Sequence, residues 1–143
     1  MALSKKIILD NGMEINYHII AMVSSYSDKP ITTLYVHSFT SKEVYKKAIK
    51  KYKLIEEQQK LIVEFQELAK IEEPSDIEKT KLDKLQTKIN KLADKIEVCV
   101  DYKECIANEF IENISYQDNL SIENLQEILK KESSNFNLAT TVA

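Results

Sequence analysis

The sequence predicts an α+β fold, with a small antiparallel β-sheet of about four or five strands, a long inserted antiparallel α-helical hairpin and a short C-terminal helix. Three observations predict it. Residues 6–39 contain apolar and β-branched runs separated by turn residues. Residues 41–96 place apolar side chains at helical spacing. Residues 97–129 contain further alternating segments and then one short amphipathic segment.

Three strands and two turns are expected before the hairpin. Asn11-Gly12 lies between two apolar runs, which predicts a type I′ turn with positive φ at both residues. Alternation over residues 13–23 slips near Ile20-Ala21-Met22, which indicates a β-bulge or an end buried on both faces. Residues 31–39 carry apolar groups on both faces, as a central strand does.

The hairpin is expected to consist of a first arm over residues 41–71 and a second arm that ends near residue 96. Thr40 or Ser41 can cap the first arm, and Ser75 with Glu78 forms a capping-box pattern at the start of the second. Apolar residues on the facing sides of the two arms predict a packed seam. The seam residues are Leu54, Leu61, Phe65 and Leu68 on the first arm and Leu82, Leu85, Ile89, Leu92 and Ile96 on the second.

A second apolar stripe runs beside the seam on the first arm. One stripe is enough to pack a single partner helix, so the second predicts either a wider intramolecular contact or an interface with another copy of the chain. Both interpretations stay open at this point. The interface candidates are Tyr45, Ile49, Tyr52, Ile55 and Ile62.

The segment after the hairpin is harder to interpret. Residues 97–102 alternate and predict a strand. Residues 103–116 fit a helix as well as a strand, and we favour a strand over 105–115 because the preceding strand needs a partner. Ser121 with Asn124 is expected to open the final helix.

These elements predict three parts of the chain. Residues 1–40 and 96–132 would form a β-rich platform with the C-terminal helix. Residues 41–95 would form the coiled-coil-like insertion. Residues 133–143 would form a polar, weakly apolar tail that is mobile unless a neighbour holds it.

Neither catalysis nor cofactor binding is indicated by any group of residues. There is one glycine, so no glycine-rich phosphate loop exists, and no nucleophile elbow is present. A zinc site would need His18, His37, Cys99 and Cys105 to meet, which strand geometry does not require. We therefore expect no enzyme activity, no cofactor and no metal, with both cysteines as free thiols.

Charge and composition limit the classes of partner that the chain is expected to bind. The net charge is -3 and every basic residue is lysine, and the absence of arginine argues against nucleic acid as a partner. No apolar run approaches the length of a membrane span, and residues 1–6 do not resemble a signal peptide. Lysines 46, 47, 50, 51 and 53 form a basic patch that either meets an acidic partner surface or is a solvated helix face.

The N-terminal segment resembles a group of small uncharacterised proteins encoded among the tail genes of phages and prophages of Gram-positive bacteria. The resemblance lies in residues 6–18, Lys-Ile-Ile-Leu-Asp-Asn-Gly-Met-Glu-Ile-Asn-Tyr-His, and in residues 35–42, which end in Ser-Phe-Thr-Ser-Lys. It covers about the first 42 residues and loosely residues 114–129, but not most of the hairpin. No functional residue is carried over.

This resemblance implies a structural component of a phage tail or tail-like particle, at the tail tip, the baseplate or a fibre attachment. The expected partners are other tail or baseplate proteins and further copies of the chain. The expected location is the virion, after synthesis in the bacterial host cytoplasm. The alternative is a cytosolic interaction module, either an assembly chaperone or an inhibitor of a host protein, that uses the hairpin.

Overall fold

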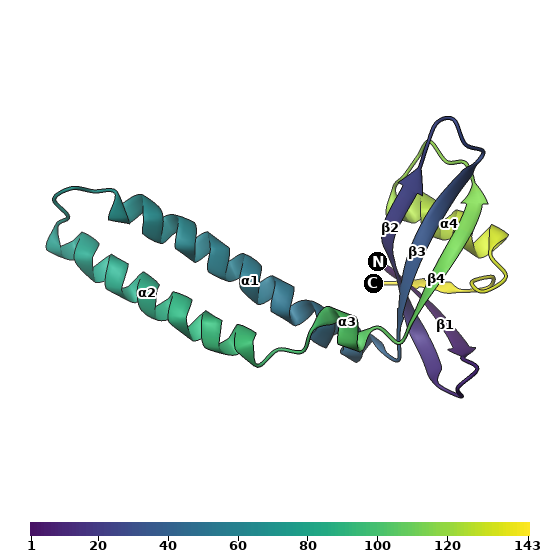
Figure 1. Cartoon of the computed structure of the whole chain (residues 1–143), viewed down its shortest axis with the longest axis horizontal. Helices are drawn as coiled ribbons and strands as arrows, with labels where there is room; N and C mark the ends of the chain where they lie inside the picture. The colour runs from purple at the N-terminus through teal and green to yellow at the C-terminus, as the bar shows by residue number, and fades with distance from the viewer. The chain divides into compact units, whose positions relative to one another are not determined.

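The computed structural model describes all 143 residues and divides the chain into two units. One unit, which we call the sheet unit, contains residues 1–45 and 103–143, and the other, the hairpin unit, contains residues 46–102. Figure 1 shows the strands gathered in the first and two long helices in the second. The α+β fold class is confirmed.

Five antiparallel strands form one sheet in the order β4-β3-β2-β1-β5. Their bounds are Ala2–Ile8 (β1), Glu14–Ser25 (β2), Ile31–Phe39 (β3), Asn108–Ser115 (β4) and Thr140–Val142 (β5). The strand favoured over residues 105–115 is thus confirmed in its larger part, because β4 pairs with β3 along its whole length.

The β1–β2 turn differs from the expected type. Gly12 has φ 84°, but no other residue of the turn has positive φ, whereas a type I′ turn needs two such residues. The amide of Gly12 donates to the carbonyl of Leu9 at 2.8 Å, and the amide of Leu9 donates to the carbonyl of Met13 at 2.9 Å. The connection is therefore a three-residue loop with glycine at its left-handed position. The hairpin was correctly predicted and the turn type was wrong.

Irregular pairing in β2 occurs where the alternation slips. Ile20 pairs with Val36, but Met22 pairs with Tyr35, so Ala21 is an extra residue in β2. This is a β-bulge. The bulge keeps Ile20 and Val23 against the core although they are an odd number of positions apart.

The core lies between one face of the sheet and α4, Ile122–Glu132 (Figure 1). Ser121 caps α4 by accepting a hydrogen bond from the amide of Asn124 at 3.3 Å, as its sequence predicts. At the other end, Glu132 accepts bonds of 2.8 and 2.6 Å from the amide and hydroxyl of Ser115, which attach α4 to β4. The buried core residues are Leu3, Leu34, Val36, Ile114, Leu125, Leu129, Phe136 and Ala139.

Two expectations for the C-terminal half are wrong. Residues 97–102 do not form a strand: Glu97 ends α2, and a short connection leads to α3, Tyr102–Cys105. Alternation over so few residues does not distinguish a strand from a loop. The strand at 97–102 was also expected to be the partner of the next one, but β4 pairs with β3 instead. Residues 133–143 are not a polar tail either, because β5 pairs with β1 and Phe136 is fully buried.

The hairpin consists of α1, Lys42–Ala69, and α2, Asp76–Glu97. Both predicted N-terminal caps are present. The Ser41 hydroxyl accepts from the amide of Val44 at 3.2 Å, and Ser75 and Glu78 form a complete capping box. In the seam, Leu85 and Leu92 are only 6% and 7% exposed, and the other predicted seam residues are half-buried.

Gln58 interrupts the seam on α1, four residues after Leu54 and three before Leu61. Its Nε2 donates to the carbonyl of Ile89 on α2 at 3.2 Å. A polar side chain at a seam position lowers stability but fixes register, because any other alignment of the helices would leave it without a partner. Gln58 therefore sets which turn of α1 faces which turn of α2.

Replacing Leu85 with Asp should unfold the hairpin. The substitution removes a buried side chain and places an unpaired carboxylate in the seam, at a cost on the order of 3 kcal/mol or more. Circular dichroism should show loss of helicity and a lower melting temperature. Gln86→Asp on the exposed side of α2 is the matched control and should leave both values close to those of the native chain. Unchanged helicity and melting in Leu85→Asp would show that the seam is wrongly assigned.

Candidate interaction surfaces

One face of the sheet is covered within the sheet unit only at its Tyr17 and Phe39 end, where Tyr45 of α1 packs on it. Successive side chains of a strand point to opposite faces, so α4 buries Leu34 and Val36 of β3 and leaves Tyr35 and His37 on the opposite side. We call that opposite side the open face. It includes Ile19, Met22, Thr33, Tyr35, His37, Glu109, Ile111 and Asn113.

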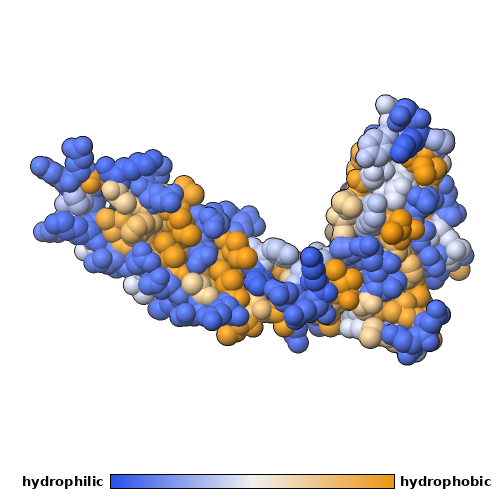
Figure 2. All heavy atoms as spheres, in the orientation of Figure 1, coloured by the Kyte–Doolittle hydropathy of each residue, from blue (hydrophilic) through white to orange (hydrophobic).

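An apolar row crosses the middle of the open face. The register pairs Met22 of β2 with Tyr35 of β3, and Tyr35 with Ile111 of β4. Met22 is 54% exposed and Ile111 is 60% exposed. Figure 2 shows hydrophobic atoms at the surface over the strands. An antiparallel sheet with one solvated face normally carries polar side chains there, so this row departs from the usual pattern.

Polar pairs lie on both sides of the apolar row. In the next row, Nε2 of His37 lies 2.8 Å from Oε2 of Glu109. On the other side, the hydroxyl of Thr33 donates to Oδ1 of Asn113 at 2.8 Å. An apolar centre with a polar rim is the arrangement found in protein–protein interfaces.

Aromatic rings close one end of the open face. The Tyr45 ring lies 5.2 Å from the Tyr17 ring and 5.2 Å from the Phe39 ring, measured between centroids. Tyr45 belongs to the first turn of α1, which is part of the sheet unit. This predicted interface residue is therefore already partly covered within its own unit.

The remaining interface candidates all lie in the hairpin unit. Ile49, Ile55 and Ile62 are half-buried, which places them at the border of the seam. Tyr52 is 57% exposed, and its ring lies 6.0 Å from the ring of Tyr102. The two apolar stripes of α1 thus form one wide face, of which α2 covers only a part. An interface with another copy remains a prediction.

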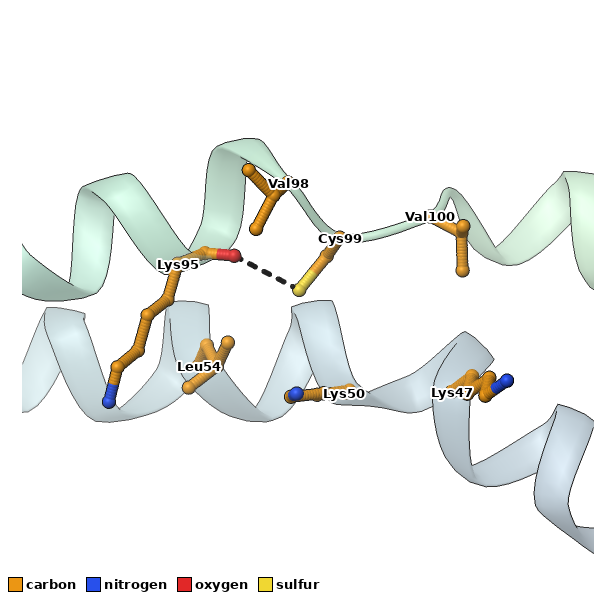
Figure 3. A pocket seen from close by; sticks show the side chains of 7 residues that line it. All are labelled: Lys47, Lys50, Leu54, Lys95, Val98, Cys99 and Val100. Carbon is orange, nitrogen blue, oxygen red and sulfur yellow. Dashed lines mark hydrogen bonds between the residues drawn. The ribbon is translucent and has the colours of Figure 1, made fainter.

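A hollow of about 460 Å³ lies at the end of the hairpin unit where α1 enters it (Figure 3). We call it the root hollow. It has a basic and apolar lining, with Cys99 directed toward α1 and its thiol donating to the carbonyl of Lys95 at 3.2 Å. The lining residues are Lys47, Lys50, Leu54, Lys95, Val98, Cys99 and Val100.

An ion pair fixes the chain beside this hollow. Nζ of Lys51 lies 2.6 Å from Oδ1 of Asp101, which joins α1 to the connection after α2. The hydrogen bond and the charge of Asp101 raise the pKa of Lys51, and the same pair lowers the pKa of Asp101. Both groups are solvated, so the pair positions residues 98–101 more than it stabilises them.

The two histidines have different environments. His37 is on the open face, whereas His18 is buried on the core side, so their side chains leave opposite faces of the sheet. Nε2 of His18 donates to the carbonyl of Lys5 at 2.8 Å, so its Nδ1 accepts from the Ser38 hydroxyl at 2.7 Å. Cys99 and Cys105 are free thiols. No three His, Cys, Asp or Glu residues are grouped in a way that would hold a metal ion.

The open face was not recognised from the sequence, although part of its signal was visible. Apolar residues on both faces of residues 31–39 predicted a central strand, which β3 is, and some of these residues belong to the open face. Met22 and Ile111 could not be assigned to the same row, because that depends on the bulge at Ala21 and on the pairing of β4 with β3.

Comparison of the chain with protein-family models, with curated proteins and with solved structures finds no match. None of the helices combines the length and the apolar character needed to cross a membrane. Function is therefore best inferred from the open face and the root hollow.

Stability should depend on pH through His18. Burial lowers the pKa of His18 below its usual 6.5, since the charged ring would lose hydration, although the bond to Lys5 opposes part of this effect. The unfolded chain therefore binds a proton more readily than the folded chain, and stability must fall as the pH drops below about 6.5. The carboxyl pKa values of Glu127 and Glu132 are lowered below 4.5, outside this window.

Denaturant unfolding at pH 7.5 and pH 5 measures the effect. The free energy of unfolding of the native chain should decrease between the two, and His18→Gln should decrease less. Equal decreases in both proteins would show that His18 is not responsible.

Proposed function

We propose that this chain is a structural component of a phage tail or tail-like particle, at the tail tip, the baseplate or a fibre attachment. It acts by protein–protein assembly. The open face of the sheet docks on a neighbouring tail protein, and the helical hairpin provides a second contact surface. No catalytic step is part of the proposal.

The observation that carries the assembly role is the row of Met22, Tyr35 and Ile111. Exposed apolar groups that lie together, with polar groups around them, are typical of interaction sites. The row is built on three paired strands, so its geometry is rigid before any partner arrives. A preorganised surface loses little entropy on docking.

The N-terminal resemblance supports the tail particle as the setting. It covers residues 6–18 and 35–42, which include the β1–β2 turn and the second half of β3. Tyr35 and His37 of the open face lie inside the second of these segments. The strands that carry the resemblance therefore also provide part of the proposed docking surface.

The second candidate is a cytosolic interaction module, an assembly chaperone or an inhibitor of a host protein, that uses the hairpin. The root hollow favours it, because lysines around an apolar floor suit an acidic, partly apolar segment of another protein. The location of the chain separates the two candidates. A tail component stays with particles through washing, whereas a cytosolic module is released.

Incorporation into particles tests the proposal. Particles induced from the bacterium that carries the gene should contain the chain after density-gradient purification and high-salt washing. Met22→Asp and Ile111→Asp should reduce incorporation at least tenfold, because each places a charge in the apolar row without removing a core residue.

Ile8→Asp is the matched control. Ile8 is 65% exposed on β1, away from the row, so this variant should be incorporated like the native chain. Circular dichroism should show that all three variants fold. Washed particles without the chain would contradict a tail role, and normal incorporation of both row variants would contradict docking through the open face.

A further inference from the structure

The two ends of the hairpin unit carry opposite charge. At one end, which we call the root, residues 46–53 and 95–102 include six lysines and two acidic residues, a net charge of +4. At the other end, which we call the tip, residues 64–78 include six acidic residues and one lysine, a net charge of −5. The hairpin unit is therefore an electric dipole along its own length.

Apolar groups accompany the charge at both ends. At the tip, Ile77 is 72% exposed and Ile71 is 39% exposed, next to Glu72 and Glu73. At the root, Val98 is 83% exposed and Val100 is 45% exposed, beside the lysines of the root hollow. The tip is thus apolar and acidic, whereas the root is apolar and basic.

We infer that a second copy of the chain covers this surface, in an antiparallel dimer in which the tip of each hairpin fills the root hollow of the other. Ile71 and Ile77 occupy the apolar floor, and Glu72 and Glu73 lie among the lysines. The dimer has a two-fold axis, so the contact between tip and root hollow forms twice. Both contacts can form together because the distance from root to tip is the same in the two copies. The dimer is closed and does not extend into a filament.

The order of charges on α1 supports the antiparallel orientation. Lys50 and Lys53 lie near the root, and Glu64 and Glu67 lie near the tip, with the same spacing of three residues. When two copies of α1 run in opposite directions, Lys50 faces Glu67 and Lys53 faces Glu64 in a single register. A parallel pairing instead places lysine against lysine and glutamate against glutamate, which is unfavourable.

Burial of apolar groups at the tip and the root supplies the remaining contact. Ile71 and Ile77 are exposed at the tip, and Val98 and Val100 are exposed at the root. Exposed ion pairs contribute little net affinity, so burial of these apolar groups holds the dimer together and the charges select its orientation. The dimer does not depend on the proposed tail function, since it forms from the purified chain alone.

Charge reversal tests the inference. Sedimentation velocity of the purified full chain should show a dimer that weakens as salt rises. Lys50→Glu with Lys53→Glu should weaken dimerisation at least tenfold, and so should Glu64→Lys with Glu67→Lys. Combining all four substitutions restores the two facing pairs, 50 with 67 and 53 with 64, with their charges exchanged, so the quadruple variant should form a dimer more tightly than either double variant does.

Lys103→Glu with Lys131→Glu is the matched control. It makes the same change in net charge at exposed positions of the sheet unit and should leave the dimer intact. A monomeric native chain at all concentrations would overturn the inference. So would a quadruple variant that stays as weak as either double variant.

Cross-linking tests the orientation. In a Cys105→Ser background, Ile77→Cys should be joined to Cys99 of the second copy by a short bismaleimide, because tip and root are adjacent across the interface. Peptide mapping should find the 77–99 link between isotopically distinct copies. A predominant 99–99 link would show a parallel dimer and contradict the arrangement. Circular dichroism should confirm that Ile77→Cys, an exposed position, folds normally.

Discussion

Incomplete burial of the apolar surface is the constraint on which this structure depends. The sheet buries one face under α4 and the segment around Phe136, and the hairpin buries the seam between two helices. Neither unit has a further layer that covers all of its other apolar side. Met22 and Ile111 therefore remain at the surface of the sheet, and Ile77 and Val98 at the surface of the hairpin. Such groups are costly to leave in water, so a partner that covers them gains free energy.

Local hydrogen bonds give each unit a defined geometry despite this thin packing. In the hairpin, the capping box of Ser75 and Glu78 fixes the start of α2, and Gln58 fixes its register against α1. In the sheet, the bulge at Ala21 brings Met22 into line with Tyr35. These devices add little stability each, but without them neither proposed surface would have a fixed shape.

The sequence was most informative where a motif acts over a few residues. Ser75 with Glu78, Ser121 with Asn124 and the slip near Ala21 each predicted a feature that the structure contains. Features that depend on long-range pairing could not be obtained in this way. Phe136 is stabilised by the core, and β5 is stabilised by β1, which lies more than a hundred residues earlier in the chain. The open face depends on the register of three strands, and the root hollow depends on the first part of α1 lying beside the end of α2.

Oxidation of methionine tests the central claim, that the open face is buried in an assembly, most directly. Hydroxyl-radical labelling followed by peptide mass spectrometry should oxidise Met22 readily in the isolated chain, where it is 54% exposed, and much less in washed particles. Met13, which is 41% exposed near the β1–β2 turn, is an internal reference for the radical dose. Protection of Met22 relative to Met13 in particles is the result we expect. Equal labelling of Met22 relative to Met13 in both samples would contradict docking through this face.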